Sequence, residues 1–240
     1  MKDLTSKLGT IDGGRILDVA TGAGSFVLTL DHLLKSYDEV IGIDSSNRAV
    51  HAGKDKFKDN AKVDFMKMDA TKMDFEPNSF DTVTISNSMH HFNNVSEVLQ
   101  NMMRVLKPGG YFLISEMCQD DGQTEAQQNH IKIHHWWAKV DACFGTVHNP
   151  TYTTAEMKNL VSTLPFGELK EFSYSYPMEN PKDEGMLKHY INTMDPYIDP
   201  LKDKPEYAHL KEESELMKQS IREHGFAPAK TVFFIGRKPL

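Results

Sequence analysis

The first half of the chain alternates short apolar runs with amphipathic stretches. The apolar runs predict buried β-strands over residues 15–20, 39–44, 63–68, 80–86 and 111–116. Helical periodicity between some of these runs predicts helices over residues 25–35, 47–57 and 95–106. Strands that alternate with helices indicate βαβ units and a mainly parallel sheet. The runs lack the polar alternation of half-exposed strands, so we expect helices on both faces of the sheet.

The pattern changes after residue 118. Residues 119–150 begin polar and become rich in His and Trp, and we interpret them as helical. A further helix and two strands are predicted over residues 153–164, 169–176 and 230–238. Residues 177–229 contain several prolines broken by helical stretches near 183–194 and 207–224. We interpret this stretch as an insertion between the last two strands.

The composition limits the classes of molecule that we expect this protein to bind. The chain has 240 residues, with 27 Lys and Arg against 34 Asp and Glu, so its net charge is −7. That balance lacks the positive field that supplies most non-specific affinity for nucleic acids. No apolar run is long enough for a membrane span, and the first residues lack the apolar core of a secretory signal. We expect a cytoplasmic protein without nucleic-acid or membrane partners; its oligomeric state is not readable from sequence.

The strongest local signal is a loop of small residues between the first strand and the first helix. Residues 18–24 read Asp-Val-Ala-Thr-Gly-Ala-Gly. Small residues let a ligand approach the backbone closely, and a helix N-terminus favours polar or anionic groups. Asp44 ends the second strand, where an acid can accept hydrogen bonds from both ribose hydroxyls. This layout predicts an adenosine-binding site.

Two details of the loop favour a cofactor with a cationic group over a diphosphate. Val27 stands where a dinucleotide-binding fingerprint has Gly or Ala at its third position. No Gly-rich motif of the nucleoside triphosphatases occurs in the chain. Asp18 would repel a diphosphate, whereas it would attract an amino group.

At these positions the sequence resembles the class I S-adenosylmethionine-dependent methyltransferases. Residues 18–24 are similar to the family's Gly-rich loop, with Ala20 in place of its first Gly, and Asp44 matches the family's ribose-binding acid. Residues 68–70, 80–92 and 105–113 resemble three further motifs in the family's order. The resemblance covers residues 14–117 and is closest to the ubiquinone/menaquinone and small-molecule subgroups.

The resemblance implies a fold and a set of cofactor contacts. We predict an α/β fold: a Rossmann-like, mostly parallel seven-stranded sheet with helices on both faces and a helical cap from the second half. The cofactor implied is S-adenosylmethionine. The residues carried over to its site are Asp18, Ala20, Thr21, Gly22, Gly24, Asp44, Ser45, Asp69, Ala70 and Asn87.

Histidines mark the side of the site where an acceptor would bind. The resemblance places residues 87–91 beside the transferred methyl group, which makes His91 a catalytic candidate and His90 a substrate-binding one. A second group falls on one side of a predicted helix, within roughly 60° about its axis. It comprises His130, His134, Trp137 and Asp141. We interpret His134 and Asp141 as catalytic.

The same helix has other interpretations. We interpret His130 and Trp137, with His148 of the following loop, as substrate-binding. A half-exposed helix with solvated histidines would show the same pattern. Histidines at i and i+4, with an acid and a further histidine, could also ligate a divalent ion. We assign no metal, because spacing alone does not show that these side chains converge.

The predicted function is methyl transfer from S-adenosylmethionine to a small molecule. We expect a single domain, residues 1–240, whose cofactor-binding half is residues 1–118. Residues 119–152 and 177–229 would form a lid over the acceptor. The alternatives are methylation of a protein or nucleic acid, and cofactor binding without catalysis. The identity of the acceptor and its target atom stay open.

Overall fold

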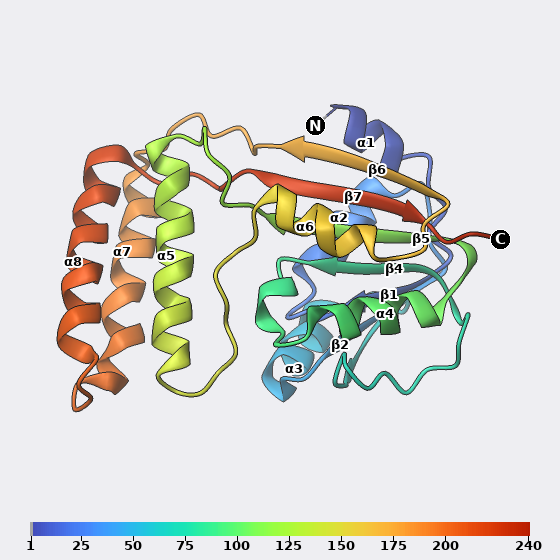
Figure 1. Ribbon diagram of the computed structural model, residues 1–240, viewed down its shortest axis with the longest axis horizontal. Coiled ribbons are helices and arrows are strands. Elements are labelled where there is room, and N and C mark those ends of the chain that lie inside the picture. The colour runs from blue at the N-terminus through green and yellow to red at the C-terminus, as the bar shows by residue number, and fades with distance from the viewer. Residues whose placement is uncertain (1) are drawn as a thin grey trace.

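A seven-stranded, mostly parallel sheet forms the centre of the protein (Figure 1). The computed structural model describes residues 2–240. The strand order is β3-β2-β1-β4-β5-β7-β6, and only β7 runs antiparallel to its neighbours. The strands are β1 (Arg15–Val19), β2 (Glu39–Asp44), β3 (Val63–Lys67), β4 (Phe80–Ser86), β5 (Leu106–Met117), β6 (Glu168–Tyr174) and β7 (Thr231–Arg237). The predicted α/β fold is confirmed.

Helices cover both faces of the sheet, as the apolar strands require. They are α1 (Lys2–Leu8), α2 (Ser25–Leu33), α3 (Asn47–Lys56), α4 (Val95–Val105) and α6 (Thr154–Ser162). One face packs α1, α2 and α3 around Ile16 and Val40 of the strands. The other packs α4 and α6 around Val83 and Phe112. Two separate apolar cores therefore fix the positions of the strand ends.

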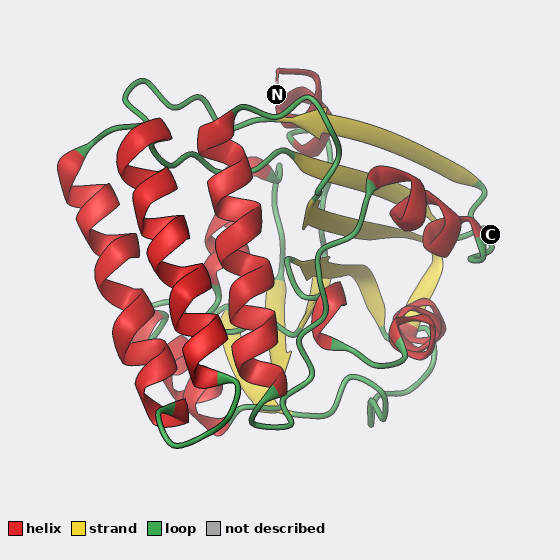
Figure 2. Cartoon of the chain, turned by 60° about the vertical axis from the view of Figure 1, so that its left-hand side comes forward, coloured by secondary structure: helices red, strands yellow, loops and turns green. Residues whose placement is uncertain are grey.

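Three long helices stand beside the sheet as a separate layer, which we name the three-helix cap (Figures 1 and 2). They are α5 (Glu125–Ala142), α7 (Glu184–Ile198) and α8 (Tyr207–His224), with a short 3₁₀ turn η2 (Asp199–Leu201) after α7. The cap has its own apolar core, centred on the buried Trp136, whose indole Nε1 donates to Leu210 O at 2.8 Å. The cap stands beyond the carboxyl end of β4.

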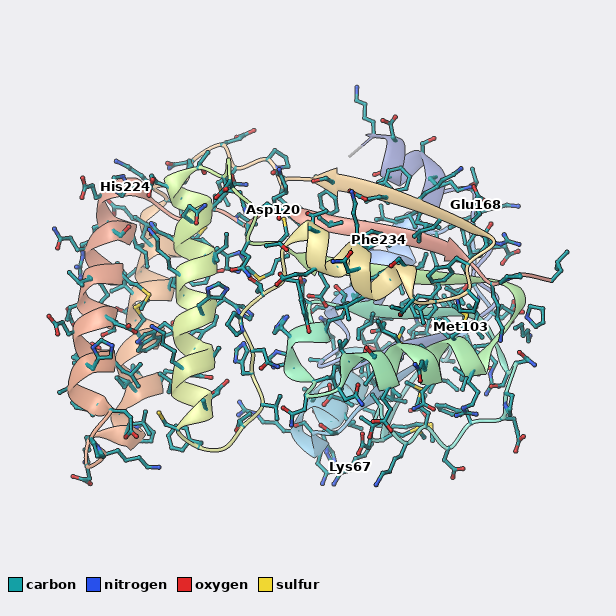
Figure 3. All side chains as sticks on the ribbon, in the orientation of Figure 1. Lys67, Met103, Asp120, Glu168, His224 and Phe234 are labelled. Carbon is teal, nitrogen blue, oxygen red and sulfur yellow. The ribbon has the colours of Figure 1, made fainter. Side chains whose placement is uncertain are left out.

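The junction between the cap and the sheet lies near Asp120, just after β5 (Figure 3). Asp120 Oδ1 accepts a hydrogen bond from Thr154 N at 2.9 Å, which fixes the start of α6 beside the end of β5. Among residues 2–240, no helix combines the length and the apolarity that a membrane crossing requires.

Several elements differ from the sequence prediction, and three of the differences have a clear physical reason. Helix α1 precedes the first strand, where none was expected, and Leu4 and Leu8 anchor it in the core. Strand β5 begins at Leu106 and includes the Pro108–Gly110 segment, which looks like a turn in the sequence. Helix α7 continues past Pro196 to Ile198, because burial of Ile198 in the cap offsets the hydrogen bond that proline cannot donate.

Candidate functional site

A cavity of about 600 Å³ opens at the carboxyl ends of the first four strands. Its size is typical of a site for a cofactor or other small molecule. The residues that line it are Ala20, Gly22, Ile43, Asp44, Ser45, Met68, Asp69, Ala70, Asn87, Ser88, His91, Phe92, Thr146 and Val147. Seven of the ten predicted cofactor residues are in this set. The cavity therefore brings together segments that are far apart in the sequence.

Two residues of the small-residue loop that line the cavity have an unusual backbone conformation. Ala20 has φ +52° and Gly22 has φ +56°, both in the left-handed region. A Cβ added at Gly22 would meet no atom within 4 Å, so the backbone there is open to a ligand. Gly24 does not line the cavity; a Cβ there would lie 2.7 Å from the rings of Phe57 and Phe65. The contact predicted for Gly24 is therefore a packing contact that brings α2 close to the sheet.

Asp44 ties the loop to the end of β2. Its Oδ2 accepts a hydrogen bond from Gly22 N at 2.9 Å, and its Oδ1 accepts one from Ser46 N at 2.9 Å. The carboxylate lies on the cavity wall beside Ser45. This is the position predicted for an acid that accepts hydrogen bonds from ribose.

Asp18 lies deeper, under the loop. Its carboxylate accepts hydrogen bonds from Thr21 Oγ1 and Thr84 Oγ1, each at 2.6 Å. Burial raises the pKa of Asp18 to about 6 despite these two bonds. Asp18 and Thr21 line a second cavity of about 230 Å³, which shares Gly22 with the first. A ligand in the large cavity can therefore extend toward Asp18.

Asp69 and Asn87 complete the cofactor side of the cavity. Asp69 Oδ1 accepts hydrogen bonds from Thr71 N and Oγ1, each at 2.8 Å, and these bonds lower the pKa of Asp69. Asp69 lines the cavity, where its carboxylate can meet a ligand. Asn87 has φ +45°, and its Oδ1 accepts from Met117 N at 3.0 Å, which joins the end of β4 to the end of β5.

Four histidines gather at the mouth of the cavity. His90 and His91 lie in a short 3₁₀ turn, η1 (Met89–His91), His134 lies on α5, and His148 lies in the loop that follows α5. The ring of His91 is 4.3 Å from the rings of both His90 and His148, and the rings of His134 and His148 are 4.7 Å apart. His148 Nε2 lies 3.3 Å from His134 Nδ1. The structure therefore makes the two histidine groups of the sequence one cluster.

Two carboxylates flank the histidine cluster. Asp141 Oδ2 contacts His148 Nδ1 at 2.7 Å, and its Oδ1 accepts a hydrogen bond from Tyr197 OH at 2.6 Å. His148 therefore links His134 to Asp141. Glu116 Oε2 lies 3.4 Å from His90 Nδ1, and both side chains are buried.

Burial keeps the imidazoles of His91, His134 and His148 neutral. It lowers the pKa of His91 to about 4 and that of His134 to about 2, and the neighbouring histidines lower both further. The pKa of His148 is also lowered by burial, although its bond to Asp141 acts in the opposite direction. Each neutral ring keeps a lone pair that can bind a metal ion.

His130, which we interpret as a substrate contact, makes packing and hydrogen-bond contacts within the protein. Its Nδ1 accepts a hydrogen bond from Ala229 N at 3.0 Å, and its ring packs 5.1 Å from that of Phe226. It therefore fastens α5 to the start of β7. Trp137 remains near the cluster, with its ring 6.3 Å from His134, and its buried Nε1 has no hydrogen-bond partner among residues 2–240.

The sequence reasoning missed Glu116 and the contact of Tyr197 with Asp141, whereas residues 146–147 of the cavity wall lie in the predicted lid segment 119–152. Glu116 had a detectable signal, since it ends a buried strand as Asp44 does. Its Oε1 accepts hydrogen bonds from Ser88 N at 2.6 Å and Met89 N at 2.9 Å, and thereby fixes η1. Tyr197 had no local signal, because its contact with Asp141 depends on how α7 packs beside α5.

Residues 17–114 match a family model described as a methyltransferase domain. Over these residues, which are less than half of the chain, the sequence is similar to methyltransferases. The matched residues contain the loop, Asp44, Asp69 and both histidines of η1. They end before α5, so the cap and His148 lie outside the match.

Curated relatives match less than half of the chain. It is 34% identical over 110 residues to demethylmenaquinone methyltransferase of Bacteroides fragilis, with 45% of this chain and 44% of the relative covered. It is 35% identical over 107 residues to the ubiquinone/menaquinone biosynthesis C-methyltransferase UbiE of Pseudomonas fluorescens, with 43% and 42% covered. The match thus spans less than half the length of each relative.

The likeness to solved structures extends over the whole chain and shows the fold. Phosphoethanolamine N-methyltransferase 2 of Haemonchus contortus, solved with S-adenosyl-L-methionine, superposes with a TM-score of 0.59 at 19% identity. The superposition covers 100% of this chain and 52% of that one. The site also fits S-adenosylmethionine, the cofactor of the family. The open backbone at Gly22 and the carboxylate of Asp44 face one cavity, and Asp18 is placed for an amino group.

Proposed function

We propose that this protein transfers a methyl group from S-adenosylmethionine to a small-molecule acceptor. One observation carries the proposal: a single cavity is lined by the cofactor residues Asp44 and Asp69 and by His91 of the histidine cluster. Cofactor and acceptor would therefore meet in one partly enclosed space. Such alignment in a site sheltered from water supplies much of the catalysis of a displacement reaction.

Each side of the cavity has a task in this proposal. The cofactor supplies a methyl group on a sulfonium, which a nucleophile attacks in line. Asp44 would accept hydrogen bonds from the ribose, and Asp18 would face the amino group of the methionine part. His91, neutral because of its lowered pKa, would accept the proton of the acceptor.

The segment after β5 would set the choice of acceptor. We propose that residues 119–152 and 177–229 act as a lid, with His134 and Asp141 as catalytic groups. His90, Trp137 and His148 would contact the acceptor. Thr146 and Val147 of this segment already line the cavity. The named relatives methylate demethylmenaquinone or serve ubiquinone/menaquinone biosynthesis, but each matches less than half of this chain, so the acceptor here can differ in class.

The test is a turnover assay that measures formation of S-adenosylhomocysteine. The acceptors offered are a panel of small phenols, thiols, amines and quinols, together with an ultrafiltered metabolite extract and its retained macromolecular fraction. We expect turnover with one small-molecule class or with the filtrate, and its loss in Asp44→Ala. Turnover only with the macromolecular fraction, or cofactor binding with no turnover at all, would contradict the proposal.

A further inference from the structure

We propose that His90, His134 and His148 bind a divalent transition-metal ion of the zinc class at the mouth of the cofactor cavity. One ring nitrogen from each histidine lies within 4.8 Å of the others. The closest pair, His148 Nε2 and His134 Nδ1, is 3.3 Å apart. Two ligands at the usual Zn–N distance in a tetrahedron are separated by roughly 3.4 Å, so this pair already has the spacing of a metal site.

The three ligands come from three segments that are tied together. Asn149 N and Nδ2 donate to His90 O at 2.8 and 3.0 Å, which holds the His148 loop against η1. Thr151 N donates to His135 Nε2 at 3.2 Å, which holds the other end of the loop against α5. These backbone ties fix the relative positions of the ligands before any ion binds, and this lowers the cost of binding.

Buried nitrogen and carboxylate groups around the cluster favour the binding of a cation. Both ring nitrogens of His90 and the Oε2 of Glu116 are buried and have no hydrogen-bond partner among residues 2–240. Unpaired buried polar groups are costly. An ion bound to Nε2 of His90 would pair that atom and leave Nδ1 to donate to Glu116 Oε2, which lies 3.4 Å away. Asp141 holds His148 through Nδ1, and Tyr197 holds Asp141 in turn. A histidine that binds such a metal usually donates its other ring N–H to a carboxylate.

Three histidines leave a coordination position open, as catalytic zinc sites do. His91 lines the cofactor cavity and lies 4.3 Å, ring to ring, from two of the ligands, so the open position would be near the acceptor. In a step that rests on the proposed function, the acceptor is a thiol or hydroxyl whose pKa the metal lowers. Its proton passes to His91, and the resulting anion forms a bond to the methyl carbon. The carbon–sulfur bond of the sulfonium breaks, and its electron pair stays on sulfur.

The test is direct metal binding to the untagged full chain after treatment with a chelator. Co²⁺ is the spectroscopic probe and Zn²⁺ the calorimetric one. We expect one Co²⁺ per chain with the intense visible absorption of a tetrahedral ion, displaced by Zn²⁺. His134→Ala and His148→Ala should lose this absorption. Asp141→Asn should weaken binding about 10–100-fold, because it removes the carboxylate behind His148.

His130→Ala is the matched control, because His130 lies on the same helix but points to Ala229. Every variant is first shown to keep the far-ultraviolet circular dichroism of the parent. No stoichiometric Co²⁺ binding, or equal binding by His134→Ala and His130→Ala, would overturn the metal site. Turnover by the metal-free chain would overturn the role in catalysis but leave the proposed methyl transfer standing. Metal binding without turnover of any acceptor would overturn the proposed methyl transfer but leave the metal site standing.

Discussion

Ala20 adopts a backbone conformation that costs an alanine more than a glycine. Its φ of +52° lies in the left-handed region, where the Cβ of an L-residue is crowded. The chain has alanine where the family pattern has glycine, yet the turn keeps the glycine geometry. The neighbouring Gly22 and Asp44 explain this, because their hydrogen bond holds the loop in place.

Ala20→Gly should therefore stabilise the protein. Relief of the left-handed strain should raise the free energy of unfolding by about 1–2 kcal/mol. The greater freedom of glycine in the unfolded chain should lower it by about 0.4–1 kcal/mol. We expect a net gain in the free energy of unfolding of about 1 kcal/mol, measured by urea denaturation. Ala23→Gly is the control, since Ala23 is not among the residues with positive φ, and it should destabilise. A loss of stability in Ala20→Gly would contradict the account.

Asp18 should make the stability of the cofactor-free protein depend on pH. Its pKa is about 6 in the folded state, above the usual value near 3.8, so the folded protein binds the proton more tightly than the unfolded chain does. Stability should therefore fall as the pH rises from about 4 to 6 and stay level above that range. Asp18→Asn removes this dependence.

We expect the stability of Asp18→Asn relative to the parent to improve by about 2–3 kcal/mol between pH 4 and pH 7. Denaturation at several pH values measures it. Cofactor affinity should change in the opposite direction, because the variant lacks the charge that faces the amino group. A stability difference that does not change with pH would contradict the assigned pKa.

At the scale of elements, the three-helix cap is a layer with its own apolar core. Its helices were predictable from periodicity, since each covers a long amphipathic stretch. The way they pack was not predictable. His130 and His134 share one side of α5, but they are one turn, about 6 Å, apart along its axis. His130 accepts a hydrogen bond from Ala229, just before β7, whereas His134 reaches the histidine cluster. Only the packing of distant segments decides this.

Trp136→Ala should loosen the cap and leave the cofactor side intact. The variant removes the largest buried side chain of the cap and should cost about 3–5 kcal/mol. Trp136→Phe keeps most of the packing but leaves Leu210 O without its donor, so its cost should be about 1–3 kcal/mol. Denaturation gives the cost, and calorimetry gives cofactor affinity, which should change less than threefold in Trp136→Phe. A large loss of affinity in that variant would contradict the independence of the two units.

At the scale of the whole molecule, the cofactor side of the site was predictable and the acceptor side only in part. The loop, Asp44, Asp69 and Asn87 each follow directly on a strand, and parallel strands bring their carboxyl ends to one edge. The acceptor side is assembled across layers instead. Glu116 meets His90 because β5 lies beside β4, and Asp141 meets Tyr197 because α7 packs near α5. No spacing within one segment encodes such contacts.

Titration calorimetry with S-adenosylmethionine and S-adenosylhomocysteine tests the central claim most directly. The parent protein should bind both ligands. Asp44→Ala should bind each about 10–100-fold more weakly, because hydrogen bonds to a charged group contribute about 1.5–3 kcal/mol. Asp64→Ala is the matched control, since Asp64 is an exposed acid of β3 whose ion pair with Lys54 lies outside the cavity. Unchanged binding by Asp44→Ala, or no binding of either ligand by the parent, would contradict the account.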